Sequence, residues 1–210
     1  MYKKHLIIGL LIVTAIILSA CGANPKQQPP MLDSGNALIP EQAPMEEQVL
    51  ENMDAEKPAA MPAWFTIGLN DVNSGGVFKV ADFQGKVILV ETMAMWCPKC
   101  LSQQKEVAKL HDALSAREDF ISIALDIDPN EDAAALADYA RKNNFNWLYT
   151  VASDEVINEI SVLYGAQFLN PPATPMLIID RQGNSHLLPF GIKSAEELQA
   201  AVQPFLDAEG

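Results

Sequence analysis

Apolar and polar positions follow two rhythms along the chain from Pro62 onward. Short apolar runs rich in Val and Ile indicate buried strands, and the clearest is Val87–Val90. Apolar residues spaced three or four apart indicate helices, as at Val107, Leu110 and Leu114. We predict strands at 87–92, 120–125, 145–151, 176–179 and 185–189, and helices at 98–115, 131–143, 154–164 and 194–208. Strands that alternate with helices predict an α/β fold with helices on the faces of a sheet.

Two local signals sharpen the end of this pattern. Ser194 and Glu197 can form a capping box, in which each side chain accepts a hydrogen bond from the other residue's backbone N–H. The last predicted helix should therefore start at Ser194. The residues at 181–184, Arg-Gln-Gly-Asn, are typical of a turn, so the last two predicted strands should run antiparallel.

The first twenty residues have a different pattern. Lys3 and Lys4 form a short basic start, and the run from Leu6 to Leu18, LIIGLLIVTAIIL, is almost entirely apolar. A basic start, an apolar core and small residues at a cleavage point are typical of an export signal. The run is shorter than the roughly 20 residues that a membrane-spanning helix needs. We therefore predict that residues 1–20 are a signal peptide outside the fold.

Cys21 follows this segment in the sequence LSAC. These residues resemble the lipobox of bacterial lipoproteins, in which the cysteine is lipidated and becomes the new N-terminus. By this resemblance, acyl chains on Cys21 hold the protein on the extracytoplasmic face of a membrane. A plain secretion signal or an uncleaved anchor is the alternative. Both place the domain outside the cytoplasm, where disulfides form and persist.

Residues 21–61 are predicted to be a flexible tether between this anchor and the domain at 62–210. They contain six prolines, many Gln, Glu and Asn, and no aromatic residue. Such a composition cannot bury enough apolar surface to offset the entropy of ordering. The stretch at 45–53 is the part that could form a short helix. The whole chain carries a formal net charge of −13, which argues against nucleic-acid binding because that function needs a basic surface.

The chemistry centres on residues 93–101, MAMWCPKCL, which contain Cys97 and Cys100. Such a pair can be half of a zinc site, a small structural disulfide or a redox-active dithiol. A structural zinc needs four ligands, and the chain has no second pair of this kind, so His111, His186 or carboxylates would have to complete it. A disulfide that closes so short a loop removes little entropy from the unfolded state. We therefore favour the dithiol.

The predicted elements agree with a redox role. A buried strand leads to Trp96 and Cys97, so Cys97 should lie at the N-terminus of the next helix. The helix dipole and unpaired N–H groups there stabilise a thiolate, which is the species that attacks disulfides. Pro98 suits the first turn, and Lys99 adds a positive charge nearby. Cys100 lies one turn further along, where it should be less exposed than Cys97 and should resolve the mixed disulfide.

The sequence WCPKC resembles the WCxxC active site of the thioredoxin superfamily. Residues 81–96, ADFQGKVILVETMAMW, resemble the approach to the active site in TlpA/ResA-like membrane-anchored thioredoxins, and residues 174–180, TPMLIID, resemble the segment with the cis-proline. The stretch near 127–152 resembles the extra helix and strand of TlpA-like proteins and peroxiredoxins. The resemblance covers roughly residues 62–208. It implies a thioredoxin fold, a mixed central sheet flanked by helices, with a helix–strand insertion after the second buried strand.

The same resemblance assigns roles around the two cysteines. Pro175 is expected to be cis and to face the dithiol, and a proline that opens a buried strand fits this position. Thr174 is expected to offer its backbone to a substrate strand. The alternative is a trans proline in an ordinary proline-rich loop. Trp96, Pro98 and Lys99, next to the cysteines, are expected to tune the site.

Glu91 lies five residues before Trp96, at the position of the buried acid of thioredoxin. A carboxyl below the dithiol should have a raised pKa and could relay the proton of Cys100. Alternatively, Glu91 points to solvent at the end of its strand. Three features depart from the family pattern: Gln103 replaces a frequent acid, Thr92-Met93 replaces Phe-Trp, and the loop from 164 to 175 is longer than in thioredoxin.

These features predict an extracytoplasmic, membrane-anchored thiol–disulfide oxidoreductase that needs no cofactor and no metal. By resemblance, it reduces disulfides of exported proteins such as apocytochrome c and receives electrons from a transmembrane dithiol carrier. An exported disulfide oxidant is the first alternative. A peroxiredoxin-like peroxidase is the second, although Ala94 stands where peroxiredoxins have threonine. A copper-delivery module is the third, although such modules carry CxxxC and only His186 could serve as the additional ligand.

The other aromatic and acidic residues are predicted to have structural roles. Trp147 and Tyr149 should lie in the core, and Trp64 and Phe65 should pack at the edge of the domain. His111 should be exposed on its helix, and His186 should be a solvated strand residue. Four acids flank a turn and a helix start, where negative charge is favourable: Asp126, Asp128, Glu131 and Asp132.

Overall fold

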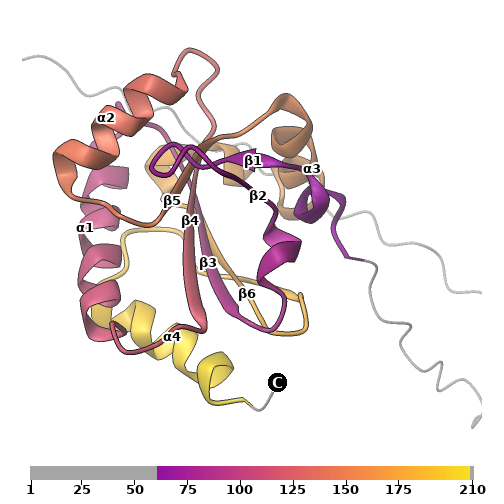
Figure 1. Cartoon of the computed structure of the whole chain (residues 1–210), viewed down its shortest axis with the longest axis vertical. Coiled ribbons are helices and arrows are strands. Elements are labelled where there is room, and N and C mark those ends of the chain that lie inside the picture. The colour runs from indigo at the N-terminus through magenta and orange to yellow at the C-terminus, as the bar shows by residue number, and fades with distance from the viewer. Residues whose placement is uncertain (1–60, 209–210) are drawn as a thin grey trace, which may run out of the picture. The chain divides into compact units, whose positions relative to one another are not determined.

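The computed structural model of the chain describes residues 61–208. The predicted signal peptide, Cys21 and the predicted tether with its helix at 45–53 lie outside the described residues. The main sheet has the order β5-β4-β3-β6-β7 (Figure 1). Its strands are β3 (Val87–Met93), β4 (Phe120–Asp126), β5 (Leu148–Val151), β6 (Met176–Ile179) and β7 (Ser185–Leu187).

This sheet is mixed, as predicted. Strands β3, β4 and β5 run parallel, β6 runs antiparallel to β3, and β7 runs antiparallel to β6. Every residue of β3 is buried, because the strand is central and both of its faces are covered. The predicted turn between the last two strands is present, with Gly183 at a positive φ of 89°.

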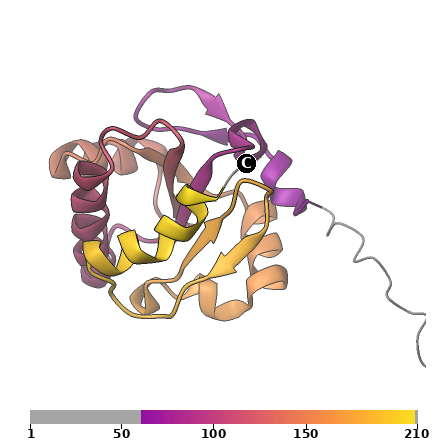
Figure 2. The same cartoon turned by 90° about the horizontal axis from the view of Figure 1, so that it is seen from below.

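Helices cover both faces of the sheet (Figures 1 and 2). The helices are α1 (Pro98–Ala113), α2 (Ala133–Asn143), α3 (Asp154–Tyr164) and α4 (Ala195–Asp207). Leu89 of β3 shares a core cluster with apolar side chains of α1, α2 and α4. Ile88 and Val90 face the other way and share a second cluster with side chains of α3. Odd-numbered residues of β3 therefore face the layer that contains the dithiol helix α1.

Most predicted elements are confirmed within two or three residues. The Ser194–Glu197 capping box is present at the start of α4. The strand predicted at 145–151 is shorter and begins at Leu148. The residues before it join an aromatic cluster, in which the rings of Phe145 and Trp147 lie 4.8 Å apart.

This cluster also corrects the prediction for His111. Its ring stacks on that of Trp147 at 5.1 Å with an interplanar angle of 10°, and it lies 5.5 Å from the ring of Phe120. His111 is half-buried, and burial lowers its pKa. The prediction of an exposed histidine was wrong because the end of α1 packs against a segment that is distant in sequence. Trp147 and Tyr149 are buried in the core, as predicted.

The first part of the domain was missing from the sequence prediction. It contains the 3₁₀ turns η1 (Ala63–Thr66) and η2 (Val80–Phe83), and between them the short hairpin of β1 (Leu69–Asn70) and β2 (Val77–Phe78). Two-residue strands are too short to show alternation. Trp64 and Phe65 are 0% and 2% exposed, so the predicted packing of these two side chains is confirmed, and both belong to a core cluster. The Trp64 Nε1 donates to the Tyr164 hydroxyl at 3.3 Å, which ties η1 to α3.

Membrane-crossing helices are absent from the part of the chain that the structure describes, since none of its helices combines the necessary length and hydropathy.

Candidate active site

The two cysteines lie at the start of α1, shortly after the end of β3. Cys97 is the N-cap of α1, and its Sγ accepts the backbone N–H of Cys100 at 3.2 Å. Pro98 occupies the first turn, as predicted. An N–H group aimed at Sγ, at the positive end of a helix dipole, favours negative charge on that sulfur.

Both cysteines are free thiols and only 1% exposed. The prediction that Cys100 is less exposed than Cys97 was therefore wrong. The Cys100 Sγ donates to the carbonyl of Pro171 at 3.3 Å, so the turn η4 (Pro171–Ala173) lies against the dithiol. Burial raises the pKa of the Cys100 thiol, and the neighbouring Cys97 acts in the same direction. Cys100 therefore needs a base before it can react as a thiolate.

Glu91 supplies a carboxyl at this end of the sheet. It is 5% exposed, so the alternative in which it points to solvent was wrong. Burial raises its pKa to about 8, while Gln104 and the charge of Lys193 act in the opposite direction. Its charge in turn raises the pKa of Cys100. The predicted raised pKa of this acid is confirmed, and near neutral pH the carboxyl is mostly protonated.

Two consecutive glutamines of α1, Gln103 and Gln104, follow Cys100, and both are fully buried. The Gln104 Oε1 accepts the hydroxyl of Tyr139 at 2.8 Å. Gln103 binds Lys193 instead, with its Oε1 accepting the backbone N–H at 2.7 Å and its Nε2 donating to the carbonyl at 3.1 Å. Sequence reasoning noted Gln103 as a departure from the family but missed Gln104, Tyr139 and Lys193.

Pro175 lies directly before β6, buried at the end of the sheet next to β3. Its carbonyl accepts the N–H of Thr92 at 3.3 Å. Thr174 has a left-handed backbone (φ 46°), and its N–H donates to the carbonyl of Pro171 at 2.8 Å. The Thr174 carbonyl accepts the Lys193 ammonium at 3.3 Å. A substrate strand that pairs with Thr174 must therefore replace existing hydrogen bonds. The cis state of Pro175 stays a prediction.

The approach to Cys97 is held by the acids after β4. Glu131 accepts the backbone N–H groups of Met95 at 2.7 Å and Trp96 at 3.3 Å. The Trp96 Nε1 donates to the Asp128 carboxylate at 2.5 Å, while the ring remains 57% exposed. Burial raises the pKa of Asp126 to about 8, and the nearby Glu131 and Asp128 add to the shift. These acids were predicted only to flank a helix start, a role that Asp132 fills as the N-cap of α2.

Metal ligands do not gather in this region. Within residues 61–208, no group of three or more His, Cys, Asp and Glu side chains is placed to hold a metal ion. His186 is only partly solvated, because its Nε2 hydrogen-bonds the Asp180 carboxylate at 2.8 Å and its ring lies 4.4 Å from that of Phe205. Pro98 and Lys99 are exposed beside the dithiol, where they can contact a substrate.

The sequence comparison identifies the family. The model of the AhpC/TSA family matches residues 60–184, a stretch that contains the dithiol, Glu91 and Pro175. The chain belongs to the AhpC/TSA family. A search of the curated proteins finds no match.

Solved structures agree with this AhpC/TSA assignment at the level of fold. A thiol:disulfide interchange protein of the thioredoxin family from Chlorobium tepidum TLS is 23% identical, with a TM-score of 0.55 over 67% of this chain and 92% of that one. A secreted Mycobacterium tuberculosis disulfide oxidoreductase homologous to Escherichia coli DsbE is 20% identical, with a TM-score of 0.52 over 67% and 96%. DsbF of the same species is 16% identical, with a TM-score of 0.53 over 69% and 98%. The predicted thioredoxin fold is confirmed.

The site of this AhpC/TSA-family protein therefore places two buried thiols next to a buried carboxyl group. Cys97 receives an N–H at the start of α1, Cys100 is a neutral buried thiol, and Glu91 is a buried acid that titrates near neutral pH. Paired thiols next to a proton acceptor can carry out dithiol–disulfide exchange.

Proposed function

We propose that this protein is an extracytoplasmic, membrane-anchored thiol–disulfide oxidoreductase that reduces disulfides of exported proteins through Cys97 and Cys100. The observation that carries the proposal is the pairing of a dithiol at the N-terminus of α1 with the buried Glu91 carboxyl. A structural cysteine pair does not require a titratable acid beside it.

In the first step the Cys97 thiolate attacks one sulfur of a substrate disulfide. The Cys97–substrate bond forms, the substrate S–S bond breaks, and the released substrate thiolate takes up a proton from solvent. The hydrogen bond from the Cys100 N–H supports the thiolate before the attack. During the attack the negative charge moves from the Cys97 Sγ to the leaving substrate sulfur. The charge thereby leaves a site that is almost fully buried.

In the second step Glu91, as a carboxylate, accepts the proton of the Cys100 thiol. The Cys100 thiolate attacks the Sγ of Cys97, the intramolecular disulfide forms, and the second substrate sulfur leaves and is protonated. Two electrons and two protons pass to the substrate, and the protein becomes oxidised. Because the pKa of Glu91 is about 8, this step should accelerate as the pH rises toward and through that value.

The surface around the dithiol supports a polypeptide substrate. Trp96, Phe190 and Ile192 are large apolar side chains that remain about half exposed. The backbone N–H of Gly191, between the last two, donates to the carbonyl of Ala173 at 2.9 Å, so this loop adjoins the segment before Pro175. Exposed apolar side chains around a nearly buried dithiol suit extended protein segments better than small polar disulfides.

The location and the redox partners rest on the N-terminal sequence and on resemblance. The export signal and the lipobox cysteine Cys21 support a lipid-anchored protein outside the cytoplasm. The TlpA/ResA-like sequence features support a reductant that receives electrons from a transmembrane dithiol carrier and delivers them to a substrate such as apocytochrome c. An oxidant that donates its disulfide to exported proteins uses the same residues in reverse.

The test is the reduction potential of the full-length protein in glutathione and dithiothreitol buffers, followed by turnover of a peptide disulfide. A potential near or below about −250 mV supports the reductant, and one near about −120 mV makes the protein an oxidant. Cys97→Ser should abolish turnover, whereas Cys100→Ser should accumulate a mixed disulfide through Cys97. If the two cysteines cannot be cycled between dithiol and disulfide, the proposed function is wrong.

The remaining alternatives have their own readouts in the same preparation. A peroxidase would consume hydrogen peroxide stoichiometrically with dithiol. The residue three positions before Cys97 is Ala94, whose buried methyl group offers no hydrogen bond to a peroxide. A copper-delivery module would bind Cu(I) with a defined stoichiometry. Loss of peroxide, or stoichiometric copper binding without disulfide turnover, would replace the proposal.

A further inference from the structure

Lys193 connects the loops around the dithiol through its ammonium group. It lies between β7 and α4, and its Nζ donates to the carbonyls of Thr174 at 3.3 Å, Pro189 at 2.9 Å and Gly191 at 2.5 Å. Thr174 precedes Pro175, whereas the other two carbonyls belong to the loop after β7. An ammonium has three donors, so one half-buried cation uses its full capacity to tie these segments together.

The backbone of the same lysine is held by the dithiol helix. Gln103 lies one turn after Cys100, and its side-chain amide both accepts from the N–H of Lys193 and donates to its carbonyl. Gln103 has no solvent exposure. The lysine is thus bound to α1 by its backbone and to the substrate groove by its side chain, which restricts where its charge can lie.

This arrangement places the ammonium on the Glu91 side of the sheet. Glu91 is in register with Met176, two residues after Thr174, and it lies on the face covered by α1 and α4. Burial lowers the pKa of Lys193, while attraction to Glu91 and Glu197 opposes that effect. The lysine charge in turn opposes the effect of burial on Glu91.

Three other titratable groups near Glu91 are uncharged where it titrates. Burial raises the pKa values of the Cys100 thiol and of the Tyr139 and Tyr149 phenols well above their usual values. These groups therefore stay protonated near pH 8. In the described part of the chain, Lys193 is the cation that acts on the Glu91 carboxylate.

We propose that Lys193 is a positioning residue for the redox reaction, holding the two loops of the substrate groove together and stabilising the Glu91 carboxylate that receives the Cys100 proton. The inference deepens the proposed function and rests on it, because it requires Glu91 to change its charge during turnover. Lys193 keeps its own protons throughout, and neither Lys193 nor Glu91 is oxidised or reduced. The proton that reaches Glu91 comes from Cys100 and later leaves to solvent.

The experiment follows the Glu91 carboxyl directly, by the infrared band of a protonated buried carboxyl group, in the full-length protein. The disulfide form is used so that Cys97 and Cys100 do not titrate, and Glu91→Gln identifies the band. Lys193→Met removes donor and charge, Lys193→Gln keeps a donor without the charge, and Lys193→Arg keeps the charge. The matched control is Lys142→Met, which removes an exposed lysine of α2. A second readout compares reduction of a peptide disulfide with alkylation of Cys97 by iodoacetamide.

We expect the Glu91 midpoint to rise by about one pH unit in the Met and Gln variants and to stay in place in the Arg and Lys142→Met variants. Peptide reduction should slow about tenfold in Lys193→Met, with a smaller loss in Lys193→Gln and little change in iodoacetamide alkylation. An unmoved midpoint in Lys193→Gln overturns the proposal, and this variant decides if Lys193→Met fails to fold. An equal shift in Lys142→Met also overturns it. A wild-type protein that reduces no peptide disulfide refutes the proposed function instead, whatever the infrared titration shows.

Discussion

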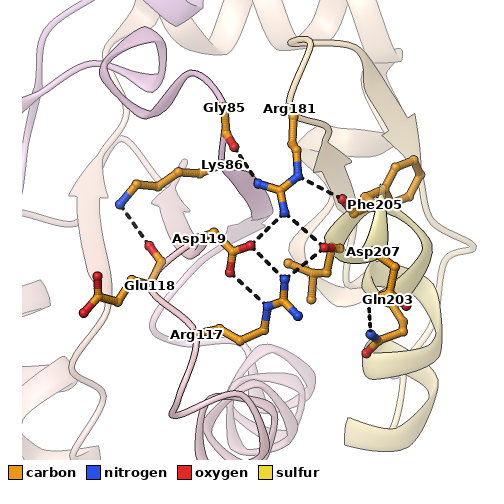
Figure 3. Close-up of polar contacts among 10 residues, drawn as sticks. Gly85, Lys86, Arg117, Glu118, Asp119, Arg181, Gln203, Phe205 and Asp207 are labelled. Carbon is orange, nitrogen blue, oxygen red and sulfur yellow. Dashed lines mark hydrogen bonds and ion pairs between the residues drawn. The ribbon is translucent and has the colours of Figure 1, made fainter. Parts of the chain in front are cut away.

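Two carboxyl groups at opposite ends of the central sheet have pKa values that are shifted in opposite directions. Asp119 lies just before β4 and accepts hydrogen bonds from the guanidinium groups of Arg117 at 2.8 and 2.9 Å and Arg181 at 2.7 Å (Figure 3). These bonds hold the pKa of Asp119 well below its usual range. Glu91, near the other end of β3, has no comparable ion pair, and burial raises its pKa.

The difference separates a network of paired charges from the site of the proposed redox reaction. Arg181 also donates to the carbonyls of Gly85, Phe205 and Leu206, so its guanidinium joins three segments of the chain (Figure 3). At that end, charge is paired with charge and contributes to stability. At the dithiol end, Gln104 and Lys193 offset only part of the effect of burial on the Glu91 carboxyl. The resulting pKa of about 8 allows this group to exchange a proton near neutral pH.

The largest effect is expected from a substitution at the dithiol end of the sheet. Glu91→Gln keeps the shape of the side chain but removes the base, so resolution of the mixed disulfide by Cys100 should slow about 100-fold. Stopped-flow measurement of substrate release measures this rate, and formation of the mixed disulfide should change much less. Asp119→Asn serves as the control, because it removes a carboxylate at the far end and should leave the resolving rate unchanged. Equal rates in wild type and Glu91→Gln would contradict the assigned role.

The second effect is expected from a substitution at the opposite end of the sheet, where Arg117 and Arg181 bind Asp119. Arg181→Met leaves Asp119 with Arg117 as its partner and leaves the carbonyls of Gly85 and Phe205 without the Arg181 donor, so it should lower the free energy of unfolding by about 2 kcal/mol. Urea denaturation measures the loss. The matched control is Arg141→Met, whose exposed pair with Asp138 on α2 should contribute less than about 0.5 kcal/mol. Similar losses in both variants would show that the Arg181 network has no special role.

The third prediction compares the pH dependence of the two ends. The folded pKa of Glu91 is raised from 4.5 to about 8, so the folded state keeps a proton that the unfolded state loses, and stability falls as pH rises between these values. The folded pKa of Asp119 is lowered, so its contribution is present above the unfolded pKa of 3.8 and is lost on acidification.

Wild type should therefore lose stability between about pH 5 and about pH 9, and Glu91→Gln should lose less. Asp119→Asn should keep the alkaline slope of wild type and lose part of the acid slope. Denaturation midpoints across this range measure both slopes. An alkaline slope that persists unchanged in Glu91→Gln would show that another group, such as the buried Asp126, is responsible.

The elements and the dithiol could be predicted because their signals are local. Helix α3 was predicted with its observed bounds, and the Ser194–Glu197 capping box correctly marked the start of α4. The position of Cys97 at a helix N-terminus followed from a buried strand that runs directly into a helical pattern. Hydrophobic periodicity and capping depend on neighbours within one or two turns, so a single sequence contains them.

The environment of the site was decided by tertiary structure. Contacts between separate elements shape the site: Gln104 and Lys193 act on Glu91, Lys193 binds the carbonyl of Thr174, and Glu131 binds the backbone of Trp96. No spacing in the sequence predicts these contacts. The burial of both cysteines under the turn at 171–173 depends on the same packing. The sequence by itself determined that a dithiol starts a helix after a buried strand. Only the fold decided the proton affinities around that dithiol, because desolvation and charge pairing depend on which distant side chains surround a group.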